Sequence, residues 1–569
     1  MFFAQVVDEA LFDFTLDSYK PLALNIRLLC IEGLVTLDNI KKGLIKKPSV
    51  KSIIEELIWN LNTDCAVKRI LGPKCERFLE RIKFYECNLA ELKETILHLY
   101  HHFNNKKYLK YIQDILIELV PGNKEKEHIY YLSKAYLTEL INYGYLPGYI
   151  YFQVNQYFFN KSNPVSDKSP EQFFNIFDFK TKLFKVVFRV DNVFNEFTPL
   201  SKILNFSIQN SYPSGNLFGF EKDFIDNKPP DDIFIVFDDV KSTNEISARY
   251  DAERPIARIA NMFSFFHHKE KPKIFNKALV INKQSNAAIL LDKPIKSIIK
   301  KEDIRPRDAV IKVKNIFDKL DLPEETILAL TKTIDIHSIA LETDEIENKL
   351  LNLWTAIETL IPKDFECEQD RIIQIIQGLS PFQSIFYIKN ILNEVAKDFF
   401  LFNQRMSSLE LKKVIVSQPE SRWGKIAALL TTKENESIRN GIYLGLNDFP
   451  LLRWRIFSIN KHFFNGKSVK KMLNDHNRKI EWQIRRIYRV RNLIVHSGVM
   501  PSYTNILVEN LHNYYDNMVN YIFDAASNNE IQYIKEGVVA CDIGLKVLLN
   551  NIDEIGEDEI SLANFKLIT

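Results

Sequence analysis

A short segment near the C-terminal end of the chain carries the side chains best suited to chemistry. It reads Arg-Asn-Leu-Ile-Val-His from Arg491 to His496 and is followed by Ser-Gly. A guanidinium can hold a phosphate through two parallel hydrogen bonds, and histidine exchanges protons readily near neutral pH. We therefore predict that Arg491, Asn492 and His496 form an acid–base site for phosphodiester cleavage. The sequence shows no metal-ligand cluster around them, so we expect neither a metal ion nor a cofactor there.

The spacing of the neighbouring polar residues predicts that they share one face of a helix. Arg485 and Arg489 lie four residues apart. Asn492 and His496 continue the row with steps of three and four, which is the spacing of side chains on one helix face. Arg491 lies off this row, although its long stem can swing back across the turn. The predicted phosphate-binding surface beside the motif comprises three arginines: Arg485, Arg486 and Arg489.

The same region has the steepest charge asymmetry of the chain. From Lys461 to Arg491 there are ten basic residues and only two acidic ones, Asp475 and Glu481. The whole chain, in contrast, has 75 Lys and Arg against 73 Asp and Glu, a net charge of +2. A nearly neutral protein that concentrates positive charge in one region is expected to bind phosphates there.

Spacing alone does not separate catalysis from a structural role. Arginines near a helix end are common, and so are isolated histidines. The chain also has a second pair of this kind, Arg455 and His462, with six residues between them. In that pair the arginine is followed by apolar Ile456 rather than by a polar residue.

Two segments together resemble a known family. Arg491–His496 resembles the signature of the HEPN superfamily: an arginine, a polar residue directly after it, a short spacer and a histidine. Residues 353–360, Leu-Trp-Thr-Ala-Ile-Glu-Thr-Leu, resemble the first long helix of the Apea-like branch, which is associated with bacterial anti-phage defence. The resemblance covers the two ends of one helical bundle, about residues 315 to 550, and does not extend to residues 1–310.

The resemblance implies a metal-independent endoribonuclease that acts in abortive infection. Arg491 would hold the scissile phosphate, His496 would act as general acid or base for attack by the ribose 2′-hydroxyl, and Asn492 would orient the cleft. The products would carry 2′,3′-cyclic phosphate and 5′-hydroxyl ends. The implied partners are RNA, a second copy of the chain that completes the cleft, and a phage-derived trigger. Glu358 either pairs with a motif arginine or faces solvent.

The pattern of apolar residues predicts a mainly α protein with a mixed α/β middle domain. We divide the chain into a helical region (1–146), a mixed α/β domain that could sense or regulate (147–312) and a helical domain with the motif (313–569). Strands are expected near 183–190, 203–208 and 233–237, and a hairpin is expected at 278–291. Helices are expected at 255–266, 343–361, 480–495 and 503–525.

Other features narrow the class of protein. The six cysteines form no CxxC pair, so reduced and buried thiols are expected instead of a zinc ribbon or a disulfide framework. The first residues, Met-Phe-Phe-Ala-Gln-Val-Val-Asp-Glu, lack the basic start of a signal peptide. No apolar run reaches the length of about 18 residues that spans a bilayer. We therefore expect a cytoplasmic protein without a membrane partner.

Two alternative functions remain open. The helical bundle could bind RNA or a protein without cutting it. Acidic residues on either side of 233–237, namely Asp231, Asp232, Asp238 and Asp239, could instead form a metal-dependent nuclease site. Acidic strand ends in solvent explain these residues equally well. We expect His337 to be a packed histidine, and we expect no metal at the pairs His101-His102 and His267-His268.

Overall fold

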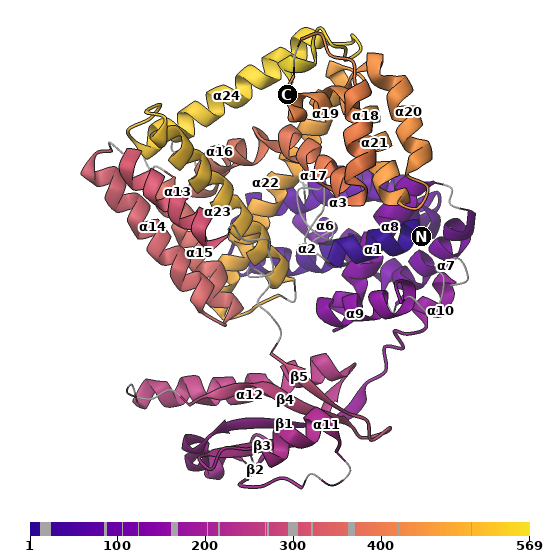
Figure 1. The fold of residues 1–569 in the computed structure, drawn as a ribbon. Helices are drawn as coiled ribbons and strands as arrows, with labels where there is room; N and C mark the ends of the chain where they lie inside the picture. Colours follow the sequence, from indigo (N-terminus) through magenta and orange to yellow (C-terminus); the bar gives the residue numbers. More distant parts are fainter. Residues whose placement is uncertain are drawn as a thin grey trace. The chain divides into compact units, whose positions relative to one another are not determined.

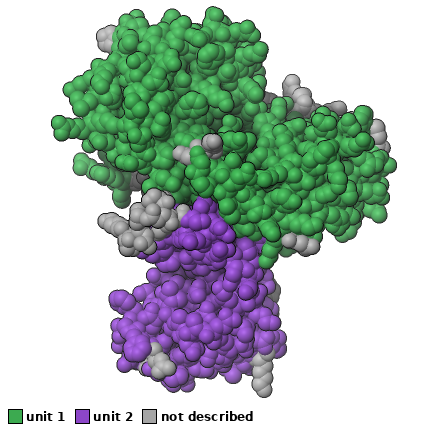
Figure 2. Space-filling view, turned by 90° about the vertical axis from the view of Figure 1, so that its right-hand side faces the viewer, with its two compact units in different colours: residues 1–138, 296–569 green, residues 139–295 purple. Residues whose placement is uncertain are grey.

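The computed structural model describes residues 1–568 with short gaps, and it divides the chain into two compact units. The gaps are at 12–23, 85–87, 105, 123–124, 161–168, 202, 214, 216, 268, 270–271, 294–304, 320–321, 362–369, 419 and 502. Unit 1 combines residues 1–138 with 296–569, and unit 2 comprises 139–295. Figure 2 colours the two units separately.

The N-terminal part of unit 1 is helical, as the sequence predicts. Its helices begin at polar caps: the side chains of Asn25, Asp64 and Asn88 each accept hydrogen bonds from backbone N–H groups of the first turn. The helices are α1 (Phe2–Leu11), α2 (Ile26–Lys41), α3 (Lys51–Thr63), α4 (Cys65–Leu71), α5 (Lys74–Lys83), α6 (Leu89–Phe103), α7 (Lys107–Gly122) and α8 (Lys126–Asn142), with a 3-10 turn η1 (Lys47–Val50) before α3.

The C-terminal part of unit 1 is also helical and contains two apolar cores. Its helices are α13 (Pro306–Lys319), α14 (Glu324–Glu342), α15 (Ile346–Leu360), α16 (Arg371–Ser384), α17 (Tyr387–Phe402), α18 (Gln404–Lys413), α19 (Arg422–Thr431), α20 (Glu436–Gly445), α21 (Pro450–His462), α22 (Gly466–Ser497), α23 (Thr504–Ser527) and α24 (Ile534–Ile555). One core joins α14, α15, α16 and α23, and the other joins α17 to α21. Figure 1 shows both groups of helices.

Helices α22 and α24 are long enough to contribute to both cores. On α22, Val469 and Leu473 lie in the second core, whereas Ile480 and Ile484 lie in the first. Residues 387–463, which lie between the two segments that carry the resemblance, therefore form a packed group of helices of their own.

Unit 2 is a small antiparallel sheet with helices on both faces. In the described residues the sheet has five strands in the order β2-β3-β1-β4-β5. The strands are β1 (Lys182–Asp191), β2 (Ser207–Gln209), β3 (Asp232–Ser242), β4 (Ile274–Asn282) and β5 (Ala288–Asp292). Helix α12 (Glu245–Phe266) packs on one face and α11 (Gly219–Asp226) on the other (Figure 1). Two short helices, α9 (Pro147–Phe158) and α10 (Pro170–Phe174), precede the sheet.

The structure confirms a mainly helical chain with a β-containing middle, and it divides the chain differently from the sequence. The predicted hairpin is present as β4 and β5, paired from Lys277↔Asp292 to Ile281↔Ala288. Helix α12 is longer than predicted because Pro255, which suggests a helix start, lies inside it. The N-terminal helices share a compact unit with the C-terminal ones, whereas the sequence suggests two separate regions.

The described helices include none with both the length and the apolar character that crossing a membrane requires. The thiols of Cys30, Cys75 and Cys541 are buried and unpaired, and that of Cys65 is unpaired and half-buried. The other two cysteines, Cys87 and Cys367, lie outside the described residues.

The indole of Trp354 is central to the first core of unit 1. It is fully buried, and its ring centroid lies 5.7 Å from that of Tyr488 on α22. Trp354→Ala should lower the free energy of unfolding by about 3–5 kcal/mol because it leaves a large cavity. Denaturant unfolding measures this loss. Thr355→Ala, on the exposed side of the same helix turn, is the control, and a loss below about 1 kcal/mol in Trp354→Ala would contradict the assignment.

Candidate active site

Helix α22 carries the motif at its C-terminal end. The side chain of Asn465 caps its start by accepting a hydrogen bond from the Ser468 N–H. Gly498 ends it in a left-handed conformation with φ 63°, and the N–H of Gly498 donates to the Ile494 carbonyl at 3.0 Å. A glycine adopts this conformation without the steric cost of a Cβ atom. The helix is therefore fixed at both ends, and its last turns present the motif.

The motif side chains remain accessible. Arg491 and Asn492 are half-buried and His496 is exposed. Arg491 Nη1 donates a hydrogen bond to Asn492 Oδ1 at 3.0 Å, which orients the guanidinium along the helix surface. The predicted catalytic residues therefore lie at a surface that a ligand can reach.

Helix geometry separates the arginine from the histidine within one chain. Arg491 and His496 are five residues apart, which is about 7.5 Å along the axis and about 140° around it. Among the described residues no hydrogen bond or ion pair joins these two side chains. Asn492 and His496, four residues apart, lie on the same side of the helix. One chain by itself therefore presents an asparagine and a histidine on one side, with the arginine displaced.

Two of the arginines predicted to bind phosphate are buried in the protein interior, which corrects that expectation. Arg486 and Arg489 are 1% and 4% exposed. Both pair with Glu32 of α2: Arg489 Nη2 lies 2.8 Å from Glu32 Oε1, and Arg486 Nε lies 3.2 Å from Oε2. Arg486 also pairs with Glu56 of α3, and Arg489 donates to Ser52 Oγ at 2.7 Å. Neither guanidinium is free to contact a phosphate.

Burial and charge act in opposite directions in this cluster. Burial disfavours the charge on Glu32, but the guanidiniums of Arg486 and Arg489 outweigh it and lower the pKa of that carboxyl. At Glu56 burial prevails over Arg486, and the pKa is raised. Burial also raises the pKa of the adjacent Tyr503 hydroxyl. Glu32 is therefore the carboxylate whose charge the two arginines require.

Acids from distant parts of the chain neutralise much of the basic run. Beyond the two buried arginines, Lys470 lies 2.6 Å from Asp553, Lys467 lies 3.3 Å from Glu557, and Lys461 lies 3.6 Å from Glu127. In the described part of the chain, five of the ten basic residues have no ion pair: Lys471, Arg478, Lys479, Arg485 and Arg491. Arg478 and Lys479 lie over the ring of Trp59. The charge asymmetry of the sequence is thus much smaller on the folded surface.

The two segments that carry the resemblance meet in the first core. Trp354 of α15 packs against Tyr488 of α22, and α15 also packs along α23. Glu358, on the same helix as Trp354, is half-buried. Among the described residues no ion pair joins Glu358 to a motif arginine, although its backbone carbonyl accepts a hydrogen bond from Arg371.

Among the described residues, the four acids around β3 belong to no group of potential metal ligands. Asp232 begins β3, and five residues of extended strand separate it from Asp238, which places the two Cα atoms about 20 Å apart. Three of the four acids have a basic partner: Arg189 for Asp232, Lys185 for Asp238 and Lys283 for Asp239. This arrangement favours structural ion pairs over the metal-dependent nuclease.

A group of potential metal ligands lies where the sequence indicates only a packed histidine. In the described part of the chain, one group of three or more such residues comes together: His337, His512 and Asp516. Burial and the neighbouring His512 lower the pKa of His337 to about 4. The signal missed in the sequence is the spacing of His512 and Asp516, four residues apart on one helix.

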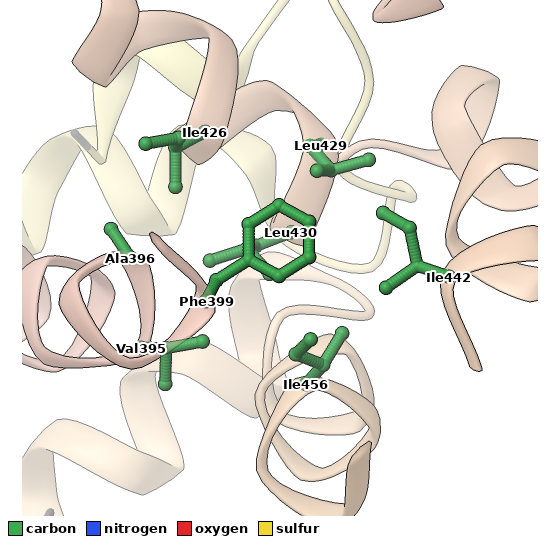
Figure 3. Close-up of a pocket in the computed structure, with 8 residues that line it drawn as sticks. All are labelled: Val395, Ala396, Phe399, Ile426, Leu429, Leu430, Ile442 and Ile456. Atoms are coloured by element: carbon green, nitrogen blue, oxygen red, sulfur yellow. The ribbon is translucent and has the colours of Figure 1, made fainter. Parts of the chain in front are cut away.

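Two hollows in the described residues are lined by side chains other than those of the motif. A cavity of about 10 Å³ in the second core is lined by apolar side chains of α17, α19, α20 and α21 (Figure 3). It offers no more room than one water molecule needs, which indicates imperfect packing rather than a ligand site. A larger open groove in unit 2, about 660 Å³, is lined by Arg189, Lys273 and Phe275 among others.

The buried cluster predicts unequal effects of two neutral substitutions. Glu32→Gln should lower the free energy of unfolding by about 3–5 kcal/mol because it leaves two buried guanidiniums with one carboxylate. Glu56→Gln should cost clearly less, since Glu56 pairs with Arg486 alone and burial, which raises its pKa, offsets more of the benefit of its charge. Denaturant unfolding at neutral pH compares them, and equal losses would contradict the assigned roles.

The same cluster predicts how stability depends on pH. The folded-state pKa of Glu32 lies below the ordinary value of 4.5. Its contribution to stability is therefore fully present above about pH 4.5 and is lost as the pH falls through the lowered pKa. Glu32→Gln should flatten this acid limb in unfolding measured from pH 7 to pH 3. An unchanged limb would show that Glu32 is not ionised in the folded protein.

Comparison with known proteins does not assign the chain to a family. No family model matches the chain, and neither a curated protein nor a solved structure does. The function must therefore be inferred from the side chains and their surroundings.

Proposed function

We propose that the protein is a metal-independent endoribonuclease of the HEPN type, with Arg491, Asn492 and His496 as its catalytic residues. The observation that carries the proposal is the accessible motif at the end of α22, on the same core as the Trp354 helix. The two segments that resemble the Apea-like branch are more than 100 residues apart in the sequence, yet they pack together. This packing supports a single helical bundle around the motif.

The proposed reaction is an internal transfer at phosphorus. The ribose 2′-hydroxyl gives up its proton and attacks the adjacent phosphate, while the bond to the 5′-oxygen breaks and that oxygen gains a proton. The products carry a 2′,3′-cyclic phosphate and a 5′-hydroxyl. His496 exchanges the proton, Arg491 stabilises the charge that develops on the phosphate oxygens, and Asn492 orients Arg491 through its hydrogen bond.

A pair of chains accounts best for the geometry. Because Arg491 and His496 point about 140° apart on α22, a second copy facing the first could bring the arginine of one chain to the histidine of the other. Two apolar side chains, Val495 within the motif and Val499 just after it, are 50% and 55% exposed. An interface would bury them. A homodimer with a shared RNA cleft is therefore the proposed assembly.

The RNA-binding surface is smaller than the sequence suggests. Arg485 and Arg491 are half-buried, with no ion pair among the described residues, so they can contact phosphates. Arg486 and Arg489 instead hold α2 and α3 against α22. Binding of RNA should therefore depend on Arg485 and Arg491.

The enzyme hypothesis predicts a specific set of RNA ends and a specific set of inactive variants. Purified protein should cleave RNA in EDTA and leave 2′,3′-cyclic phosphate ends, which end-group analysis detects. Arg491→Ala should reduce the rate by about 100- to 1000-fold, and His496→Ala by at least about 100-fold. His462→Ala is the matched control, because this exposed histidine also follows an arginine and should leave the rate unchanged.

The alternative of a binding module predicts a different pattern. Arg491→Ala would then weaken RNA binding, His496→Ala would change little, and no cyclic phosphate ends would form. Cleavage that needs a divalent ion and is lost in Asp238→Ala would instead place the chemistry in unit 2.

The resemblance also supports a role in anti-phage defence, where the other parts of the chain restrain the nuclease until a phage-derived trigger is present. The buried ion cluster decides which part of the chain can be deleted to test restraint of the nuclease. Removing residues 1–310 would delete Glu32 and Glu56 together with α2 and α3, which cover this side of α22, so the bundle itself would lose packing and ion pairs. Unit 2 can be removed without touching this cluster.

Replacing residues 143–304 by a flexible linker should therefore increase growth arrest when the protein is expressed in bacteria. The same replacement with His496→Ala should abolish the arrest, because the toxicity would come from RNA cleavage. Growth curves at matched protein levels measure both. Unchanged toxicity without unit 2 would argue against restraint by this unit.

A further inference from the structure

A cluster of two histidines and one aspartate joins α14 to α23 within the first core of unit 1. His512 and Asp516 are one turn apart on α23, and His337 comes from α14. The imidazole ring of His337 lies 4.9 Å from that of His512 and stacks on Tyr515 at 4.6 Å. One potential ligand atom from each of the three residues lies within 4.8 Å of the other two.

One nitrogen of each histidine in this cluster lacks a hydrogen-bond partner among the described residues. His337 Nε2 and His512 Nδ1 are both buried and unsatisfied. A buried polar atom without a partner costs about 1–3 kcal/mol, so native proteins supply a hydrogen bond, a water or an ion at such places. Two unsatisfied nitrogens beside one carboxylate indicate a ligand that all three groups share.

The distances fit a metal ion better than a direct hydrogen bond. His512 Nδ1 lies 3.1 Å from Asp516 Oδ2, although Nδ1 makes no hydrogen bond of acceptable geometry. Ligand atoms about 2.1 Å from one Zn²⁺ ion lie about 3.0–3.4 Å apart in tetrahedral or octahedral geometry. The pair on α23 already has this separation. The three ligand atoms lie within 4.8 Å of one another, so an approach of His337 by about 1.5 Å would complete the set.

We propose that His337, His512 and Asp516 bind a divalent transition-metal ion, with Zn²⁺ the best match to two imidazoles and one carboxylate. The side chain of Asp516 is 36% exposed, so water can reach the ion and fill its remaining position. The ion cross-links α14 to α23 and stabilises this side of the core. This inference does not rest on the proposed ribonuclease activity.

Zinc binding to chelator-treated, tag-free protein tests the site directly. Isothermal titration with Zn²⁺ alone should give one tight site per chain, and Zn²⁺ at about 100-fold above its Kd should raise the Tm by about 3 °C. Co²⁺ in the same site should give the visible absorption of a protein-bound ion. Asp516→Asn and His337→Ala should each weaken Zn²⁺ binding by at least about 100-fold.

A matched control separates this site from ordinary surface histidines. His128 pairs with Glu125 at 2.7 Å on the surface, so it offers a histidine and a carboxylate without the third ligand, and His128→Ala should bind Zn²⁺ like the wild type. Asp516→Asn changes a partly exposed side chain, and circular dichroism checks that it folds.

No stoichiometric Zn²⁺ binding, or equal binding by wild type and both cluster variants, would overturn the proposal and leave a buried water as the shared ligand. RNA cleavage retained by Asp516→Asn would separate this ion from the chemistry at His496.

Discussion

The ion cluster of Arg486, Arg489, Glu32 and Glu56 is the interaction on which the organisation of unit 1 depends. Four charges removed from water are tolerable only if each keeps a partner, because an unpaired buried charge costs several kcal/mol. The cluster therefore ties α2 and α3 to α22, although more than 400 residues separate them in the sequence. Trp482 strengthens the same contact by donating its indole N–H to Glu55 at 3.0 Å. The N-terminal helices are thus part of the body that holds the motif helix in place.

This constraint determines how the motif is presented. Helix α22 is held on one side by Glu32 and Glu56 and on another by the apolar row from Ile480 to Val490. The last turn of α22 extends beyond the ion cluster and beyond this apolar row. Arg491 and Asn492 are therefore half-buried, and His496 is exposed. The angle of about 140° between Arg491 and His496 is set by their spacing on α22, and the cluster fixes the direction in which each side chain leaves the protein. The proposed pairing of two chains rests on this angle.

The sequence predicts features that depend on local pattern. The hairpin of β4 and β5, the helix around Trp354 and the end of α22 at Gly498 all follow from alternation, three-and-four spacing and glycine. Prediction from the sequence fails where the environment of a side chain depends on residues far away in the chain. In the sequence Arg486 and Arg489 resemble phosphate ligands, but in the fold Glu32 and Glu56 lie beside them. Lys470 likewise has no acidic neighbour in the sequence, whereas Asp553 lies beside it in the fold. The cluster of His337, His512 and Asp516 escapes notice for the same reason, because His337 lies on a different helix from the other two.

The central claim is that Arg491 and His496 act together on one ribose-phosphate link, across two chains. A heterodimer of one Arg491→Ala chain and one His496→Ala chain, co-expressed with different tags and purified through both, tests it most directly. This heterodimer has one intact arginine and one intact histidine on opposite chains. It should cleave RNA and leave cyclic phosphate ends, whereas each mutant homodimer should not. A heterodimer as inactive as the two homodimers, beside an active wild type, would contradict the shared site.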